Sequence, residues 1–314
     1  MQNLQRRAST IPPAVWMIAG LLLIFGTNVK NYFQIKNFTN IVIQAAPLLV
    51  IACGQTVIVL LQGTDLSVGA SASMVTVLWV VFLQAGFPIV AAMLLAVLCA
   101  VLAGFMNGVV IAKGKLPPFI ATLGMQNILR TVALVASNGS SIYFDHPLFK
   151  IIAKRTVWGI PISVWIAISC VAITWLMLRK TRMGTRITAL GGNSEALTLA
   201  GVSVDRSIIS AFVFSGLMAG IGGILLGSRI ESGNPIAGNG FEFNAVAAVL
   251  LGGTSMREGR GGVVGTIFGV LLIQILKAGL NQIGVSSIYQ NAIIGAVVLA
   301  AIILDAYIKR KQEE

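Results

Sequence analysis

Two polar stretches interrupt an otherwise apolar sequence, and they hold the residues whose types and spacing could do chemistry. In the longer one, residues 179–206, Asn193 and Ser194 can cap a short helix, because their side-chain oxygens can accept hydrogen bonds from its first backbone N–H groups. Glu195 then stands in the first turn, where the helix dipole favours a carboxylate, and Gly201 offers a stop. Five basic residues lie in the same stretch. It predicts a docking element for a cytoplasmic partner.

The second polar stretch, residues 60–71, reads LLQGTDLSVGAS and contains one carboxylate, Asp65. Asp65 can cap a helix that begins at Leu66 by accepting backbone N–H bonds, and this role needs only the local sequence. Asp65 could also be a gate or pathway residue near the inner mouth of a transporter. The two roles are compatible, and the local sequence favours the cap.

The composition indicates which solvent surrounds the chain. Of 314 residues, 56% are hydrophobic and 10% are charged, whereas soluble domains carry about 25% charged residues. So few charged residues cannot cover the surface of a globular protein in water, and the chain is therefore predicted to be a polytopic membrane protein. Its net charge of +12 comes from basic residues scattered between apolar runs. They are better explained as signals of membrane topology than as a nucleic-acid surface.

Apolar runs long enough to cross a bilayer, about 20 residues each, predict an all-α fold of about ten transmembrane helices. The whole chain, residues 1–314, is expected to form one membrane-spanning domain. Most Lys and Arg residues fall on one side if both termini are cytoplasmic, which supports an N-in, C-in topology. The weak point is the eighth segment, which is too short to cross unaided. The expected spans are 14–33, 41–61, a run after residue 71 to about 84, 88–112, 119–137, 162–178, 207–230, 243–254, 263–283 and 288–307.

The second polar stretch also resembles a known signature. The segment GTDLSVGAS, residues 63–71, is similar to the G-x-DLS-x-G motif of permease subunits of binding-protein-dependent ABC sugar importers, in the ribose/xylose/galactose-type branch. The segments LGGTS (251–255) and GVSSIYQ (284–290) are similar to the same branch. The resemblance covers about residues 40–307.

The longer polar stretch resembles the coupling loop of these permeases. Glu195, Ala196 and Leu197, followed by Gly201, are similar to the family's EAA-xxx-G pattern, although Leu197 replaces the second alanine. The resemblance implies that this loop docks on a cytoplasmic ABC ATPase. The residues that would form the contact are Asn193, Ser194, Glu195, Ala196 and Gly201.

The resemblance also implies a function and partners. The chain would be the permease of an ATP-driven importer in the bacterial cytoplasmic (inner) membrane, paired with a second copy or a related subunit. A periplasmic or extracellular binding protein would deliver a monosaccharide to the outer loops, 138–161 and 231–240. The sequence has no G-x-x-x-x-G-K-[ST] phosphate loop, so ATP and Mg²⁺ would belong to the partner ATPase, and the chain would bind no cofactor or metal and would not be an enzyme.

Two other functions remain open at this stage. An ion-gradient-driven secondary transporter would need a functional carboxylate in the membrane, and Asp65 and Asp305 both stand at the ends of spans. The other is a non-transporting membrane scaffold or receptor subunit, which would need no such carboxylate.

Polar side chains within apolar runs are candidates to line a sugar pathway, because amides form hydrogen bonds with hydroxyl groups. Hydrogen bonds between helices explain most of them equally well. Arg130 and Lys277 also fall inside apolar runs, where they either reach toward an interface or face an aqueous path. The candidate pathway or gate residues are Gln55, Asp65, Ser67, Asn107, Gln126, Asn127, Asn281, Gln282, Gln290 and Asn291.

Overall fold

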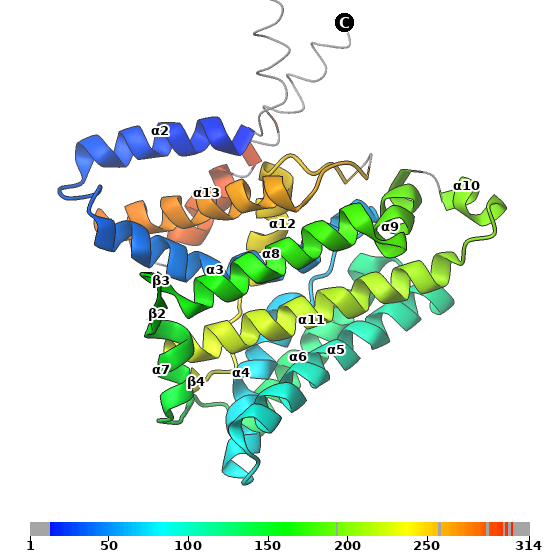
Figure 1. The fold of residues 1–314 in the computed structure, drawn as a ribbon, viewed down its shortest axis with the longest axis horizontal. Coiled ribbons are helices and arrows are strands. Elements are labelled where there is room, and N and C mark those ends of the chain that lie inside the picture. Colours follow the sequence, from blue (N-terminus) through cyan, green and yellow to red (C-terminus); the bar gives the residue numbers. More distant parts are fainter. Residues whose placement is uncertain are drawn as a thin grey trace, which may run out of the picture.

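The computed structural model describes residues 13–192, 194–256, 259–286, 289–297, 299–300 and 303, and in these ranges the chain is mostly helical (Figure 1). The helices are α2 (Pro13–Asn28), α3 (Ile35–Leu60), α4 (Val68–Gln84), α5 (Ile89–Gly114), α6 (Pro118–Ala136), α7 (Pro147–Lys154), α8 (Ile162–Lys180), α9 (Arg182–Gly192), α10 (Ser194–Leu199), α11 (Val204–Ile230), α12 (Phe241–Leu251) and α13 (Val263–Gln282).

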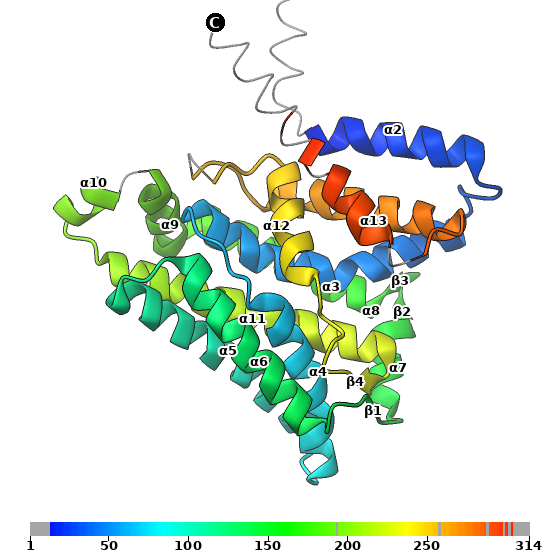
Figure 2. The same ribbon diagram turned by 180° about the vertical axis from the view of Figure 1, so that it is seen from behind.

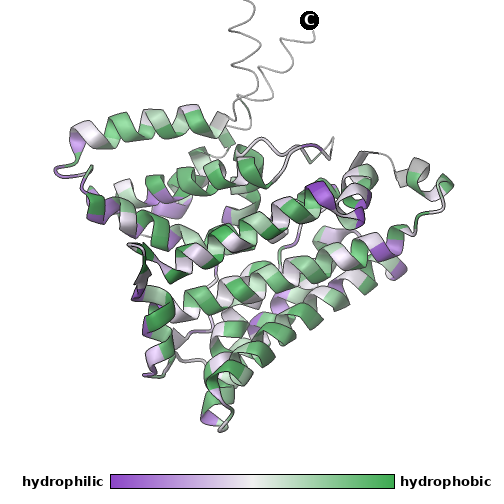
Figure 3. Cartoon of the chain, viewed as in Figure 1, coloured by the Kyte–Doolittle hydropathy of each residue, from purple (hydrophilic) through white to green (hydrophobic). Residues whose placement is uncertain are grey.

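Within the described residues, six helices are long and apolar enough to cross a membrane, namely α3, α5, α6, α8, α11 and α13. Three shorter apolar helices, α2, α4 and α12, accompany them. Figure 3 shows apolar residues along α5, α8 and α11, with hydrophilic residues gathered around α9 and the start of α11. The chain is therefore a polytopic membrane protein, as its composition predicts. The last expected span, 288–307, is helical at 289–297 and lies largely outside the described residues.

Helix α11 is central to the bundle and packs on α5, α3 and α4 (Figure 1). Its approach to α5 depends on glycine, because a Cβ atom at Gly104 would overlap the backbone carbonyl oxygen of Phe212. A Cβ atom at Gly216 would lie 2.5 Å from the carbonyl oxygen of Ala100. The spacing of Ala100, Gly104 and Gly108 predicts a close-packing face, and this prediction is confirmed.

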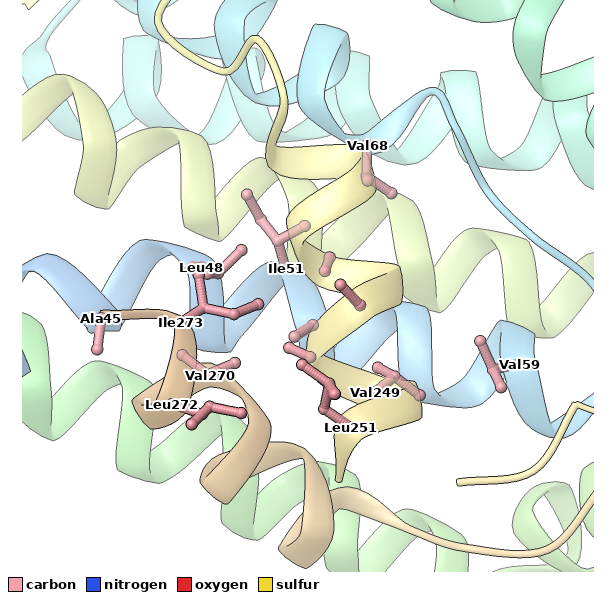
Figure 4. Close-up of a cluster of buried hydrophobic side chains, with 14 of the residues drawn as sticks. Ala45, Leu48, Ile51, Val59, Val68, Val249, Leu251, Val270, Leu272 and Ile273 are labelled. Carbon is pink, nitrogen blue, oxygen red and sulfur yellow. The ribbon is translucent and has the colours of Figure 1, made fainter. Parts of the chain in front are cut away.

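A second core region lies where α12 packs between α3 and α13 (Figure 4). Its buried side chains are small or β-branched to a large extent, and they include Leu48, Ile51, Val249, Leu251, Val270 and Ile273. Here too the backbones approach closely, since a Cβ atom at Gly269 would overlap the carbonyl oxygen of Ala248. This contact anchors the short helix α12 firmly against a full-length one.

Two small antiparallel sheets lie at the end of the bundle opposite α10 (Figure 1). Strand β1 (Ile142–Tyr143) pairs with β4 (Ser232–Gly233), and β2 (Thr156–Val157) pairs with β3 (Ile160–Pro161). The all-α expectation is right for the bundle but wrong for these loops. Strands of two residues are too short to produce an alternating pattern in the sequence.

The turn-rich sequence of residues 231–240 predicts an outer loop, and its turns are confirmed at residues 235–240. After β4 these turns pack along α4, where Asn234 N–H donates to Thr76 Oγ1 (3.0 Å) and Gly238 N–H donates to Ser73 Oγ (2.8 Å). Side chains of α4 thus satisfy part of the non-helical backbone, which is the condition for such a chain inside a membrane. Helix α12 begins after these turns.

The glycine contact between α5 and α11 gives a test of the packing. Replacing Gly104 by alanine should destabilise the protein by about 2 kcal/mol, because the new methyl group forces the two helices apart. Gly20 of α2 is a matched control, since a Cβ atom there meets no atom within 4 Å. Thermal unfolding of the purified protein in detergent measures both. Equal stability of the Gly104→Ala and Gly20→Ala variants would contradict the close contact.

Candidate functional site

The loop between α3 and α4, residues 61–67, lies inside the bundle and carries Asp65. Asp65 Oδ1 accepts hydrogen bonds from the Ser67 backbone N–H (3.0 Å) and from the Ser67 hydroxyl (2.6 Å). The first of these bonds closes a local turn of the chain just before α4. Helix α4 begins at Val68, with Ser67 as its N-cap residue and without a side-chain cap bond, so the prediction that Asp65 caps a helix from Leu66 is wrong by two residues.

The same loop is tied to three neighbouring helices. The Ser215 hydroxyl of α11 donates to Asp65 Oδ2 (2.8 Å), and Asn107 Nδ2 of α5 donates to Ser67 Oγ (2.9 Å). The Gln55 amide of α3, oriented to satisfy both groups, donates to the Asp65 carbonyl (3.1 Å) and accepts from the Asp65 N–H (3.2 Å). These five residues are the Asp65 cluster. The sequence identifies four of them and misses Ser215, because serine within a helix is common and carries no distinct signal.

Burial distinguishes the Asp65 cluster from a channel lining. None of its five residues is more than 4% exposed. A carboxylate at this depth is stabilised by the hydrogen bonds that it accepts, and these charge-assisted bonds are stronger than neutral ones. The cluster therefore acts as a junction of four elements, α3, the α3–α4 loop, α5 and α11, in the conformation described.

A second polar group lies at the start of α12, the helix that Figure 2 shows in front of α3. Glu242 is 3% exposed, and its Oε1 accepts a hydrogen bond from Gln126 Nε2 of α6 (3.0 Å). One turn along α6, Arg130 Nη2 donates to Asn239 Oδ1 (3.0 Å). Glu242, Gln126, Arg130 and Asn239 are the Glu242 cluster. Arg130 thus bonds to the turns before α12 and does not simply reach toward an interface.

The two clusters are connected through α6 and α4. Thr122 of α6 accepts a hydrogen bond from Leu66 N–H (3.2 Å), and Gln126 follows one turn later. Gly69, in the first turn of α4, lies against Glu242, since a Cβ atom at Gly69 would overlap Glu242 Oε2. Glu242 is the candidate that the sequence analysis missed. Its signal is that of a lone carboxylate in the apolar helix FEFNAVAAVLL.

The remaining candidate pathway residues do not join these clusters. Asn127 is exposed on α6 and donates to the Leu123 carbonyl of its own helix (3.2 Å). Gln290 Nε2 donates to Asn281 Oδ1 (2.7 Å) and closes the turn after α13, while Asn291 is exposed. Gln282 Nε2 donates to Asn37 Oδ1 (2.6 Å). Hydrogen bonding between and within helices, the alternative explanation, describes these contacts.

Residues 179–206 form two helices, α9 and α10, where the sequence predicts one. Asn193 lies outside the described residues, and so do the side chains of Ser194, Glu195 and Ala196. Gly201 ends α10 as expected: it has a left-handed φ of 73°, and its N–H donates to the Thr198 carbonyl (3.0 Å). The Val202 N–H donates to the Leu197 carbonyl (3.2 Å), which completes a Schellman motif. The large apolar side chain of Leu199 is 85% exposed on this projecting helix.

Helix α9, which the sequence analysis missed, joins the connector to the Asp65 loop. The Gly191 carbonyl accepts a hydrogen bond from Gln62 Nε2 (2.6 Å). A Cβ atom at Gly191 would overlap the carbonyl oxygen of Leu60 and lie 3.1 Å from Gly259. Backbone therefore meets backbone where α9 rests on the end of α3. A displacement of α9 must act directly on the loop that holds Asp65.

The described residues contain no group of three or more His, Cys, Asp or Glu side chains that could hold a metal ion. A bundle of apolar helices around buried polar clusters, with a short helical connector at one end, defines a multi-pass membrane protein. The chain belongs to the family described as branched-chain amino acid transport system / permease component, whose model matches residues 37–302. It is thus a permease, and its resemblance to the permeases of sugar importers is confirmed by relatives that match over most of its length.

Three relatives show the extent of this similarity. The chain is 36% identical over 301 residues to the ribose import permease protein RbsC of Haemophilus influenzae, covering 94% of this chain and 93% of the relative. It is 38% identical over 291 residues to RbsC of Escherichia coli (91% and 90%). It is 34% identical over 298 residues to the D-allose transport system permease protein AlsC of E. coli (94% and 91%). No solved structure matches the chain.

Substitutions at Asp65 test whether the residue is mainly structural. Asp65→Asn keeps an acceptor for the Ser67 N–H and should cost about 1 kcal/mol, whereas Asp65→Ala removes three hydrogen bonds and should cost about 3 kcal/mol or more. Thermal unfolding and uptake measurements check this, with Asp145→Asn on the exposed loop as control. Loss of transport in Asp65→Asn at unchanged stability would show instead that the residue is a gate.

Proposed function

We propose that the chain is the membrane-spanning subunit of an ATP-driven importer that passes a monosaccharide into the cytoplasm. The observation that carries the proposal is the similarity, over nine-tenths of the chain, to permeases named for ribose and allose. The family description names branched-chain amino acids, but the three relatives described above are named for ribose and allose. The setting of the protein is the bacterial cytoplasmic membrane.

The projecting end of the bundle is the cytoplasmic one in this proposal. The basic residues of the connector lie at the end of α8, in α9 and at the start of α11, and cytoplasmic loops are rich in Lys and Arg. The non-helical segment 234–240 and the half-length helix α12 together complete one crossing, which supports ten crossings with both termini inside. Segments of non-helical chain joined to half-helices are common where membrane transporters bind their solutes.

Docking of an ABC ATPase on α10 supplies the driving force. Leu199 gives the ATPase an apolar contact, and the basic residues of the connector give it a charged rim. Closure of the ATPase moves α9. Through Gly191, this movement pushes on Leu60 and Gln62, and therefore on the loop that holds Asp65. The Asp65 cluster passes this displacement to α5 and α11. ATP and Mg²⁺ are bound by the ATPase, and this chain binds neither.

A second copy of the chain, or a related subunit, completes the pathway. Helix α6 exposes Asn127 and Thr131 on its outer face, and such groups are unfavourable against lipid. They are satisfied when this face borders an aqueous path between two subunits. On the opposite side of the membrane, the sheets β1–β4 and β2–β3 with α7 form the surface that receives the sugar-binding protein.

Reconstitution tests the function directly. The permease, its ATPase and its binding protein in liposomes should take up D-ribose, D-allose or D-fructose only when ATP is inside, because the chain has no motive force of its own. Labelled L-leucine serves as the control solute. Uptake that persists without ATP and collapses with an uncoupler would establish a secondary transporter. Binding without any flux would establish a receptor subunit.

Two glycines of the connector allow a matched test of docking. Gly201 and Gly192 are both exposed and neither has a neighbour within 4 Å of an added Cβ atom, but only Gly201 has a positive φ. Gly201→Ala should strain the end of α10 by about 1 kcal/mol and lower ATP-driven uptake, while Gly192→Ala should not.

Glu195→Lys should likewise weaken the ATPase contact. ATPase co-purification and uptake are measured alongside thermal unfolding of the bundle, which should stay unchanged. Undiminished uptake in both Gly201→Ala and Glu195→Lys would remove α10 from the mechanism.

A further inference from the structure

The Glu242 cluster contains two buried atoms whose hydrogen-bonding capacity is unused. Glu242 Oε2 and Arg130 Nε each lack a hydrogen-bond partner among the described residues. An unsatisfied polar atom costs about 1–3 kcal/mol when buried, and more if it is charged. Native proteins keep few such atoms, and each requires an explanation. An unused acceptor and an unused donor in one cluster are complementary to a ligand that offers both.

The fold holds the Glu242 carboxylate in one place. Gln126 donates to Oε1, so that Oε2 is the free oxygen. Oε2 lies over Gly69, where any larger residue would occupy its position. Gly240, the N-cap residue of α12 with a φ of 82°, joins the preceding turns to the helix two residues before Glu242. The carboxylate is thus positioned by three elements, α4, α6 and α12, and is not left to find its own orientation.

The Arg130 guanidinium lies one turn further along α6 and is held on one side only. Its Nη2 donates to Asn239, three residues before Glu242, and no ion pair of 4 Å or less joins Arg130 to Glu242 among the described residues. The two opposite charges therefore belong to one cluster but are not paired. A small molecule can bridge them.

The cluster adjoins the surface of the single chain. Asn239 is exposed, and Asn127 is exposed on the same helix as Gln126 and Arg130. Phe243, the residue after Glu242, is 63% exposed. The amides of Gln126 and Asn239, which bond to the carboxylate and the guanidinium, are groups that bind the hydroxyls of a sugar. This surface is also the one that the proposed function assigns to the aqueous path.

We propose that Glu242, Gln126 and Arg130 form a binding site for a neutral polyhydroxy compound, the monosaccharide in transit, with one hydroxyl donating to Glu242 Oε2 and another oxygen accepting from Arg130 Nε. The proposal rests on the proposed function and assigns its solute site. The pair of opposite formal charges disfavours an anion at Glu242 and a cation at Arg130. A branched-chain amino acid could pair with both charges, but its apolar side chain would lie among amide groups.

The test uses the complete importer in liposomes, with D-ribose, D-allose and D-fructose as probes. Glu242→Gln keeps the shape of the side chain, and its remaining oxygen can still accept from Gln126. The substitution removes the negative charge and replaces one carboxylate oxygen by an amide NH2 group. Sugar uptake should fall about tenfold or more, the effect of losing one hydrogen bond to a charged group. ATP hydrolysis stimulated by the loaded binding protein should persist, so that fewer sugars enter per ATP. Glu242→Asp, which retains the carboxylate, should recover part of the uptake.

Ser169→Ala is the control, because Ser169 is exposed on α8, outside the proposed path, and its hydroxyl donates to the Trp165 carbonyl of its own helix (2.9 Å). Uptake by this variant should equal that of the wild type. Normal uptake by Glu242→Gln would overturn the site while leaving the importer function intact. A joint fall in uptake, ATP hydrolysis and unfolding temperature would show a structural role and would also overturn it.

Two outcomes with the wild type bear on the chemistry of the ligand. Competition by L-leucine as strong as that by the sugar would overturn a polyhydroxy site in favour of an amino-acid site. Failure of the wild type to take up any probe in the presence of ATP would overturn the importer function itself, and the inference with it. The two failures are distinguishable because only the second abolishes wild-type transport.

Discussion

A bilayer offers no water to a polar group inside it, and this constraint governs the centre of the molecule. Asp65 is buried in that centre, and it is stable there because Ser67 and Ser215 direct N–H and O–H groups at its two oxygens. The donors come from separate parts of the chain. Satisfying one carboxylate therefore brings the α3–α4 loop and α11 together, and Asn107 adds α5 through Ser67. The polar centre is as important for the arrangement of these helices as the apolar core around it.

Helix α9, the Asp65 cluster and the Glu242 cluster follow one another through direct contacts. Helix α9 rests on the end of α3 through Gly191, the next residues of the chain form the Asp65 loop, and α4 follows directly with Gly69 against Glu242. The first of these contacts joins backbone atoms, and the last joins the Gly69 backbone to the Glu242 carboxylate. A short series of packed groups thus links the connector to the start of α12.

The sequence predicts the membrane class, most of the helices and the family, because apolar runs and the DLS motif are local signals. It also predicts four members of the Asp65 cluster, since amides and carboxylates are conspicuous in apolar runs. It does not predict Ser215 or α9, whose roles depend on what lies across the bundle. The path of residues 234–240 is likewise decided by Ser73 and Thr76 of a distant helix. The sequence does not predict Glu242, which falls between the loop predicted at 231–240 and the short span predicted at 243–254, whereas the helix begins at Phe241.

The glycine contacts between helices have a mechanical consequence. Where α5 meets α11 at Gly104, and where α12 meets α13 at Gly269, backbone faces backbone and no long side chain inserts between the helices. Such surfaces are smooth, so one helix can slide along the other without side chains having to disengage and repack. Small sliding movements of packed helices are an established form of domain motion. The closest contacts between helices in the bundle are therefore also the surfaces along which these helices can slide.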